Sequence, residues 1–312
     1  MPSEPLVSVI INAHNGERYL RETIDTVYAQ TYKNWEIVLW DDASTDGTES
    51  IARSYDARLR YFKGAKAIGL GQARNFAVEQ AKGEFLAFLD QDDLWLPMKL
   101  QKQIPLFHDQ KVGLVYSDAI NFNESGMSKR VYGDAECCTG YCFPRLFRNY
   151  FLLIQTVVIR RSSLDSLDSW FEPGFSMTEE SDLFMRIAYR WKMAMVQEPL
   201  AKGRLHSSSW TWKLHHRTAD EFEATLFKYQ RIYPDFNSKF PKEIEAFQVN
   251  TIVTRAKSYW ISNKSMKARE CLVPIVFSDP RVFAFFWLTY LPSEIVYSIV
   301  SKLRGTIYPV WH

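Results

Sequence analysis

The 312-residue sequence predicts an α/β fold with a mostly parallel central sheet, helices on both faces of that sheet, and a C-terminal α-helical appendage. Two observations lead to this prediction. In the N-terminal part, short apolar runs alternate with segments whose apolar residues recur at helical spacing. Such alternation is typical of parallel sheets covered by helices on both faces. The C-terminal part shows helical spacing instead.

The alternating part begins with the strand-like run LVSVIINA. It is followed by ERYLRETIDTVYAQ, in which Leu20, Ile24 and Val27 repeat at helical spacing. The stretch GLGQAR near Arg74 lacks the third glycine of a dinucleotide-binding turn, and we interpret it as a loop at the start of a helical segment. The further expected strands are 36–40, 59–63, 85–90, 112–118 and 194–200, and the further expected helices are 44–55, 69–84, 97–107 and 178–191.

The C-terminal part predicts helices over 219–233 and 251–271. Segment 281–304 is strongly apolar and aromatic, but Pro292 and Glu294 interrupt it. We interpret it as an interfacial or interhelical pair of helices whose basic Lys302 and Arg304 meet anionic lipid headgroups. The alternative is an ordinary helix packed on the domain or on a second subunit. The expected domains are a catalytic domain over 1–215 and a helical region over 216–312.

Composition excludes several classes of protein. With 46% hydrophobic, 15% aromatic and 24% charged residues, the chain is expected to be globular. A net charge of +2 gives no indication of a nucleic-acid partner. The four cysteines fit neither zinc spacing nor a disulfide framework, so we expect reduced thiols in a cytoplasmic protein. The sequence shows neither a signal peptide nor an uninterrupted transmembrane span.

Three carboxylates follow the apolar run FLAFL. Asp90 and Asp92 lean to the same side of an extended chain, and Asp93 points away. One aspartate at a strand end is common because its side chain starts turns. Two like charges on one side repel unless a cation lies beside them, and Mg²⁺ or Mn²⁺ suits hard oxygen ligands together with phosphates. The motif alone leaves a divalent cation site and a simple loop as alternatives.

Two further polar clusters follow neighbouring strands of the predicted sheet, at 12–15 and 41–42. In open α/β sheets the carboxyl ends of parallel strands share one edge, and ligands bind there. A nucleotide diphosphate with Mg²⁺ or Mn²⁺ would satisfy such an acidic edge. The phosphate-binding motifs of dinucleotide dehydrogenases and P-loop ATPases are both missing from the sequence.

Five motifs in order, SVIINAHN, DDASTDGT, GLGQARN, GEFLAFLDQDD and TEESDLFMR, resemble the bacterial-type family 2 glycosyltransferases, which have the GT-A fold. The resemblance spans about the first 210 residues. It implies inverting transfer of a sugar from a nucleotide-diphosphate donor, usually UDP-linked, to an acceptor hydroxyl. Polymer synthases of this family carry Q-x-x-R-W, whereas Ile187 stands at the Gln position here, so we expect transfer of a single sugar.

The resemblance also implies roles for individual residues. Asp90 would face the ribose side of the metal site, Asp92 would bind the metal, and His206 would approach the metal or the diphosphate. Where the family usually has P-x-Y-N, this chain has an imidazole, so the identity of the base is open. The other residues matched to nucleotide binding are Asn12, His14, Asn15, Asp41, Asp42 and Arg74.

Three acids open the helix predicted after Thr178, which is a suitable N-cap. Acids in a first turn also interact favourably with the helix dipole, which is a purely structural explanation for them. Asp182 and Arg186 are four residues apart and can pair on the helix surface, so Asp182 is the better structural candidate. Glu180 has no such partner, and we expect it to be the general base; both Glu180 and Asp182 are kept as catalytic candidates.

The sequence therefore predicts a cytoplasmic, metal-dependent inverting glycosyltransferase with Mn²⁺ or Mg²⁺. Its acceptor would be a glycan or a lipid-linked precursor of a cell-surface polysaccharide. Trp210 and Trp212 would form a wall for the sugar or, alternatively, belong to the core. A membrane surface on the inner face of the cell membrane and a second copy of the chain are considered as partners. The alternatives are a sugar nucleotidyltransferase and a non-catalytic nucleotide-sugar-binding module.

Overall fold

The computed structural model describes residues 4–133, 137–206 and 214–296. They form two compact units. Of the described residues, the first unit comprises 4–133, 137–143 and 152–206, and the second comprises 144–151 and 214–296. Trp210, Trp212, Lys302 and Arg304 lie outside the described residues.

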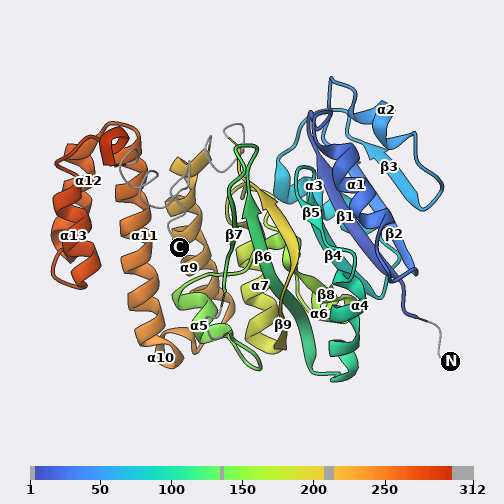
Figure 1. Cartoon of the computed structure of the whole chain (residues 1–312). Coiled ribbons are helices and arrows are strands. Elements are labelled where there is room, and N and C mark those ends of the chain that lie inside the picture. The colour runs from blue at the N-terminus through green and yellow to red at the C-terminus, as the bar shows by residue number, and fades with distance from the viewer. Residues whose placement is uncertain (1–3, 134–136, 207–213, 297–312) are drawn as a thin grey trace. The chain divides into compact units, whose positions relative to one another are not determined.

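The first unit is built on one mixed sheet (Figure 1). Its parallel part joins β1 (Val7–Ala13) to β2 (Trp35–Asp41) and β4 (Phe85–Asp90), and β2 to β3 (Leu59–Lys63). The strand order is β3-β2-β1-β4-β8-β6-β9-β5, and β7 pairs with β6. The remaining strands are β5 (Leu94–Trp95), β6 (Val112–Phe122), β7 (Ser128–Arg130), β8 (Val158–Arg160) and β9 (Lys192–Arg204).

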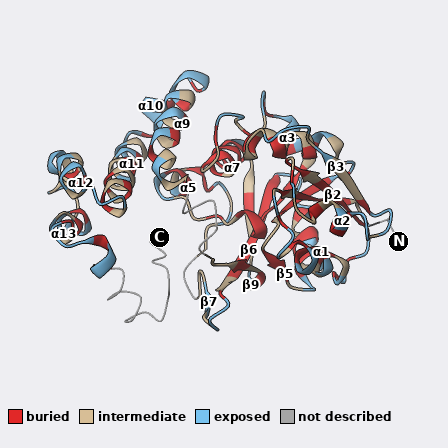
Figure 2. Cartoon of the chain, turned by 90° about the horizontal axis from the view of Figure 1, so that it is seen from above, coloured by how far each residue is buried: buried red, intermediate tan, exposed pale blue. Residues whose placement is uncertain are grey.

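Helices cover both faces of this sheet because the central strands are apolar on both sides, as Figure 2 shows by their burial. On one face, Val9 and Leu39 belong to a core that includes Leu20, Ile24 and Leu100. On the other face, the ring of Phe88 packs against the rings of Phe171 and Phe184. The helices of this unit are α1 (Leu20–Tyr28), α2 (Thr48–Ala52), α3 (Leu70–Gln80), α4 (Lys99–Gln103), α6 (Arg161–Asp165) and α7 (Glu179–Arg190), with 3₁₀ turns at Ile104–His108 and Ile154–Thr156.

The predicted order of strands and helices is confirmed, but α3, α4 and β8 differ from the expectations, and β5, β7 and α6 were not predicted either. The helix α3 begins at Leu70, directly after Gly69 with φ +89°, so the interpretation of GLGQAR as a loop is wrong. The helix expected over 97–107 ends at Gln103 and continues as a 3₁₀ turn that contains a proline. The antiparallel strand β8 lies between β4 and β6, and its three residues are too few to show a periodic pattern.

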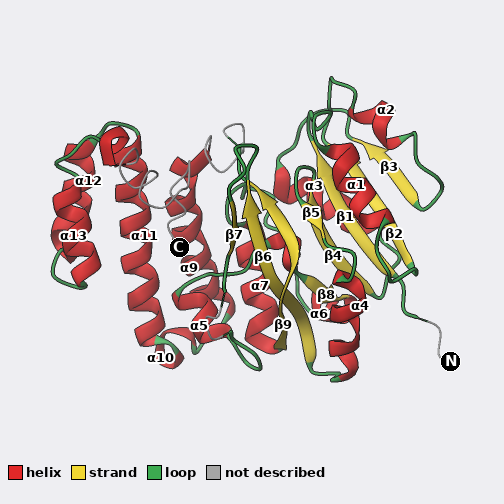
Figure 3. Ribbon diagram, viewed as in Figure 1, coloured by secondary structure: helices red, strands yellow, loops and turns green. Residues whose placement is uncertain are grey.

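The second unit consists of helices, as Figure 3 shows. Its core is aromatic: Phe147 of α5 (Phe143–Arg148) stacks on Phe247 with ring centroids 4.4 Å apart. The other helices are α9 (Thr218–Ile232), α10 (Phe236–Lys239), α11 (Pro241–Ile261), α12 (Ser265–Leu272) and α13 (Pro280–Leu288), with 3₁₀ turns at His215–Arg217 and Val273–Ile275. The predicted helical appendage is therefore confirmed. None of the helices that the structure describes is both long enough and apolar enough to cross a membrane.

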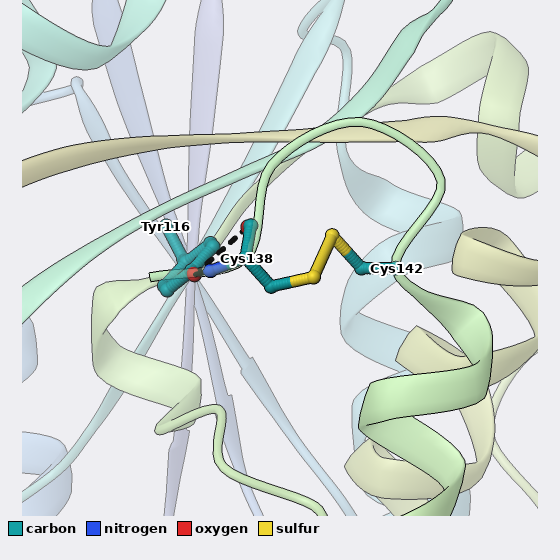
Figure 4. The surroundings of a disulfide bond; sticks show 3 residues. All are labelled: Tyr116, Cys138 and Cys142. Atoms are coloured by element: carbon teal, nitrogen blue, oxygen red, sulfur yellow. Dashed lines mark hydrogen bonds between the residues drawn. A yellow bond between two sulfur atoms is a disulfide. The ribbon is translucent and has the colours of Figure 1, made fainter. Parts of the chain in front are cut away.

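A disulfide joins Cys138 and Cys142 (Figure 4). The backbone N–H of Cys138 donates to the Tyr116 hydroxyl at 3.1 Å, and that hydroxyl donates to the Cys138 carbonyl at 3.0 Å. The expectation of four reduced thiols is wrong for this pair. A spacing of four residues, with Gly140 at φ +82°, brings the two Cα atoms to 6.0 Å, which is within the range that a disulfide spans.

Candidate active site

The polar ends of β1, β2 and β4 meet at one edge of the sheet. Asn12 lies opposite Trp40 on one side and opposite Asp90 on the other, and Ala13 lies opposite Asp41. This register brings together the polar clusters that follow the three strands. It is the arrangement expected when parallel strands end at the same edge.

Arg74 on α3 connects this edge to α7. Its side chain is buried, and it donates to Asp90 Oδ1 at 2.9 Å, to Glu179 Oε1, and to Glu180 Oε2 at 3.3 Å. The first turn of α3 can approach the segment before α7 closely because residue 71 is a glycine. A Cβ atom on Gly71 would lie 2.4 Å from the Glu172 carbonyl oxygen. A single guanidinium therefore joins the end of β4 to the start of α7.

The next residue along α3, Asn75, fixes the segment that leads toward α7. Its Nδ2 donates to the Phe171 carbonyl at 2.8 Å, and its Oδ1 accepts from the Phe171 N–H at 3.0 Å. The GLGQARN motif thus has three roles. Gly71 allows close packing on the segment before α7, Arg74 pairs with three carboxyl groups, and Asn75 forms two hydrogen bonds with the backbone of Phe171. None of these roles needs a glycine-rich phosphate loop.

The helix α7 places two glutamates at the site. It begins at Glu179 after Thr178, as predicted, although the Thr178 side chain makes no capping hydrogen bond. The Glu179 side chain is 1% exposed and the Glu180 side chain is 23% exposed. Glu180 is therefore partly exposed to solvent, whereas Glu179 is enclosed. Glu180 has no basic partner three or four residues along its own helix, as expected, but Arg74 approaches it from another helix.

Two of the carboxyl groups around Arg74, those of Asp90 and Glu179, have raised pKa values. Burial is the main cause for Asp90, and the charges of Asp92 and Glu180 add to it, while Arg74 acts in the opposite direction. Burial and the neighbouring Glu180 charge raise the pKa of Glu179, again against Arg74. More carboxylates meet here than one guanidinium neutralises, so the cluster favours binding of further cations or donors.

Asp92 and His206 meet across the site. His206 follows β9, and its Nε2 lies 2.7 Å from Asp92 Oδ2. Arg204 holds the same segment, because its Nε donates to the Asp92 carbonyl at 2.9 Å and its backbone N–H donates to Asp93 Oδ1 at 2.8 Å. Burial, followed by the charges of Asp92 and Asp90, raises the pKa of Asp93.

These residues fit a divalent cation. Asp92 Oδ2 and His206 Nε2 form a hydrogen bond of 2.7 Å, which brings a carboxylate oxygen and an imidazole nitrogen to one place. Carboxylate and imidazole ligands both suit Mn²⁺. The described residues contain no group of three or more His, Cys, Asp or Glu side chains that could hold an ion. The pair would therefore bind an ion together with diphosphate oxygens or water.

Three predicted residues, Asn12, His14 and Asn15, lie at and directly after the end of β1. The Asn12 Nδ2 is buried and has no hydrogen-bond partner within the described part of the chain. The His14 Nδ1 lies 2.7 Å from the Asp42 carbonyl oxygen, and Asn15, at φ 51°, accepts from the Thr45 N–H at 2.9 Å. An enclosed amide donor at the edge of the sheet is suited to a ligand acceptor.

The carboxylates of Asp41 and Asp42 both accept hydrogen bonds from other residues of the chain. Asp41 is fully buried, and it accepts from the Ser44 N–H at 2.7 Å and from the Tyr61 hydroxyl at 2.6 Å. Asp42 accepts from the Ile68 N–H at 3.1 Å and 3.2 Å through its two oxygens. Both residues lie at the expected edge, where they hold the loops that follow β2 and β3.

Asp182 lies away from these contacts. Its Oδ2 accepts from Arg186 Nε at 3.0 Å and Nη2 at 2.8 Å, which confirms the predicted pair. The pair is buried rather than on the helix surface, and Arg186 also donates to the Ser169 carbonyl at 2.6 Å. Asp182 therefore connects α7 to the segment before it.

Sequence reasoning missed Glu179 and Asn75 as parts of the site. Glu179 was visible as the first of two adjacent acids, and Asn75 directly follows Arg74 in the same motif. Their partners lie 105 and 96 residues away in the chain, so no local pattern reveals them.

The comparison with protein families identifies the chain. Residues 8–166, just over half of the sequence, match the model of Glycosyl transferase family 2. The chain belongs to glycosyltransferase family 2. The match confirms the predicted family and identifies an enzyme that transfers a sugar. Of the functions considered from the sequence, it favours neither a nucleotidyltransferase nor a non-catalytic module.

Relatives of this family 2 glycosyltransferase include an uncharacterized glycosyltransferase of Rickettsia typhi. It is 27% identical over 310 residues, which cover 95% of this chain and 91% of the relative. The UDP-Glc:alpha-D-GlcNAc-diphosphoundecaprenol beta-1,3-glucosyltransferase WfgD of Escherichia coli is 32% identical over 161 residues, which cover 51% of this chain and 62% of WfgD.

Solved structures share the fold. Residues 1–349 of S. aureus TarS in complex with UDP-GlcNAc superpose with a TM-score of 0.64 at 16% identity, covering 97% of this chain and 93% of that one. The mannosyltransferase PcManGT from Pyrobaculum calidifontis, in complex with GDP-Man and Mn²⁺, gives a TM-score of 0.61 at 19% identity, covering 97% and 81%. The predicted GT-A fold is therefore confirmed for this glycosyltransferase.

Proposed function

We propose that this family 2 glycosyltransferase moves one sugar from a UDP-sugar to a hydroxyl group of a lipid-linked glycan, with inversion at the anomeric carbon. The convergence of Glu180, Arg74 and Asp90 beside the Asp92–His206 pair supports this proposal most strongly. A partly exposed carboxylate near a carboxylate–imidazole pair is what a base beside a cation and a diphosphate would need.

In the proposed reaction, Glu180 accepts the proton of the acceptor hydroxyl. The hydroxyl oxygen bonds to the anomeric carbon from the side opposite the nucleotide, the bond from that carbon to the diphosphate oxygen breaks, and UDP leaves with the electron pair. A Mn²⁺ or Mg²⁺ ion held by Asp92 and His206 would neutralise negative charge on the diphosphate when bound. Arg74 keeps Asp90 and Glu180 in place during the transfer.

The base and ribose would bind at the end of β1. The buried Asn12 Nδ2 has no partner among the described residues and would donate to a ligand acceptor, and His14 and Asn15 follow Asn12 in the chain. Asp42 would act there through the loop that it holds. UDP is proposed because the name of WfgD specifies UDP-Glc and the TarS complex contains UDP-GlcNAc.

The acceptor class is proposed from the name of the same relative. WfgD is named for an acceptor in which GlcNAc is joined through a diphosphate to undecaprenol. An acceptor of this class would suit an enzyme of polysaccharide assembly that works at a membrane surface.

A test combines donors with one acceptor. The protein is incubated with UDP-glucose, UDP-GlcNAc, GDP-mannose or a dTDP-sugar, with Mn²⁺, and with or without a short-chain analogue of GlcNAc-diphosphate-lipid. We expect release of UDP that increases when the acceptor is added and product with the inverted anomeric configuration. Release of UDP that is the same with and without acceptor, or a product that retains phosphate from the donor, would contradict the proposal.

We further propose that the second unit contacts the membrane that holds such an acceptor. Phe283, Trp287 and Tyr290 on and after α13 are 42%, 56% and 58% exposed. Phe285 instead packs on Trp260 with ring centroids 5.6 Å apart. The aromatic face is therefore separate from the core of this unit, and exposed aromatic rings favour the interface of a lipid bilayer.

Flotation with phosphatidylglycerol vesicles tests this contact. The triple variant Phe283→Ser, Trp287→Ser, Tyr290→Ser is expected to lose vesicle binding with an unchanged melting temperature, whereas the wild type floats. Wild-type protein that remains at the bottom of the gradient, apart from the vesicles, would contradict the membrane contact. Dimerisation that is lost in the same variant would assign the face to a second copy instead.

A further inference from the structure

The carboxyl group of Glu179 is enclosed without a full set of donors. Its side chain is 1% exposed, and its Oε1 accepts from Arg74 Nη1. Its Oε2 is buried and meets no donor among the residues that the structure describes. An ionised carboxylate in such a place would leave one oxygen both charged and unpaired, which is costly in a buried site.

The neighbouring Glu180 supplies an acceptor rather than a donor. The Glu179 and Glu180 carboxyl groups both accept from Nη1 of Arg74, so the two groups lie next to one another, and the neighbouring Glu180 favours a proton on Glu179. Arg74 already shares its one positive charge with Asp90 and both glutamates. One proton between the two glutamates removes a surplus charge and turns a repulsion into a hydrogen bond.

We propose that Glu179 is a positioning residue: a neutral carboxylic acid that accepts from Arg74 and donates to Glu180, and thereby aims Glu180 at the acceptor hydroxyl. This inference rests on the proposed role of Glu180 as the base. Burial of Glu179, more than any other cause, raises its pKa, in agreement with the geometry. The exposure of the Glu180 side chain, 23% against 1% for Glu179, leaves Glu180 as the group that meets the substrate.

Two substitutions separate this role from others. Glu179→Gln keeps an oxygen for Arg74 and supplies an N–H for Glu180, so it mimics the neutral acid. We expect turnover of the UDP-sugar within about threefold of the wild type. Glu179→Ala removes both bonds, and misplacement of the base by about 1 Å is expected to lower kcat about 100-fold with KM for the UDP-sugar unchanged.

Two results would overturn the proposal. If Glu179→Gln loses as much turnover as Glu179→Ala, the site needs a carboxylate at this position and not a neutral donor. If Glu179→Ala keeps the turnover of the wild type, Glu179 does not position the base. The melting temperature of each variant, with and without UDP and Mn²⁺, identifies any loss that comes from unfolding.

An infrared measurement needs no turnover and so separates this proposal from the proposed function. We expect the wild type at neutral pH to show a carbonyl stretching band of a protonated carboxyl group that is lost in Glu179→Gln and retained in Asp182→Asn. Identical spectra of the wild type and Glu179→Gln in this region would overturn the neutral acid. A wild type that shows the band but transfers no sugar would contradict the proposed function alone.

Discussion

The acids at the two ends of the parallel sheet differ in how many hydrogen-bond donors surround them. Near the amino end of β2, Glu36 lies opposite Ser8 and accepts from its hydroxyl at 2.7 Å. It also accepts from the Lys82 N–H at 2.7 Å and from Arg60 at 3.0 Å. Burial raises the pKa of Glu36, but these hydrogen bonds outweigh burial and lower it below its ordinary value.

At the carboxyl end the balance is reversed. Asp90 and Glu179 share Arg74, and burial together with neighbouring carboxylates raises the pKa of both. The amino end supplies enough donors for Glu36. At the carboxyl end, protein donors meet Asp41 and Asp42, but the acids around Arg74 outnumber the charges that neutralise them. The difference shows which end is complete without a ligand and which end is suited to bind a cation and a diphosphate.

The largest expected effect concerns the base at the carboxyl end. Glu180→Gln keeps the shape of the side chain but cannot take a proton, so turnover is expected to fall by about two to four orders of magnitude. Affinity for UDP with Mn²⁺ should survive. Acceptor-dependent turnover at saturating UDP-sugar, with calorimetric titration of UDP, gives both quantities. A variant with normal turnover would remove Glu180 from the mechanism.

The next effect concerns stability within the same helix. Asp182→Asn removes the charge that Arg186 meets in a buried pair, and loss of one partner of such a pair costs about 3 kcal/mol. We expect a lower urea midpoint and normal turnover per folded molecule. If Asp182→Asn folds as well as the wild type but loses turnover, Asp182 is the base and the assignment of Glu180 is wrong.

A smaller loss of stability is expected at the amino end. Glu36→Gln places an amide N–H where an acceptor is needed by Arg60, Ser8 or the Lys82 N–H, at a cost of about 1–3 kcal/mol. Turnover at saturating substrate should not change. Urea unfolding and a turnover assay of the same variant test this prediction. A folded variant that loses turnover would show that Glu36 at the amino end also serves the reaction.

The smallest effect is the pH dependence that Glu36 contributes. Its folded pKa lies below its ordinary value of 4.5, so its contribution to stability is present above that pH and is lost as pH falls through the folded pKa. We expect Glu36→Gln to flatten the acid limb of the plot of unfolding free energy against pH below about 4.5. Parallel acid limbs in the two proteins would show that Glu36 carries no such dependence.

The sequence was informative where chemistry follows local order. The apolar runs predicted the strands, and the rule that parallel strands end at one edge predicted that Asn12, Asp41 and Asp90 would meet there. The family motifs also predicted that Asp92 and His206 belong to one place, and they lie 2.7 Å apart. These predictions needed only the strand pattern and the order of motifs.

Other features depend on partners that are distant in the sequence. Asp41 resembles Asp92 as an acid after a strand, but the Tyr61 hydroxyl encloses it. Glu180 resembles an unpartnered acid until Arg74 approaches from α3. The burial of the Asp182–Arg186 pair follows from packing against the segment at Ser169. Such partners are set by tertiary packing, which no periodic pattern of a single element contains.

Calorimetric titration of UDP in Mn²⁺ and in EDTA, with the wild type and Asp92→Asn, tests most directly that the carboxyl end binds a cation and a diphosphate together. We expect the wild type to bind UDP more tightly in Mn²⁺ than in EDTA, since the ion joins Asp92 and His206 to the diphosphate. In Asp92→Asn this gain should disappear while the melting temperature stays the same. Equal affinity of the wild type in Mn²⁺ and in EDTA, or an undiminished gain in Asp92→Asn, would contradict the account.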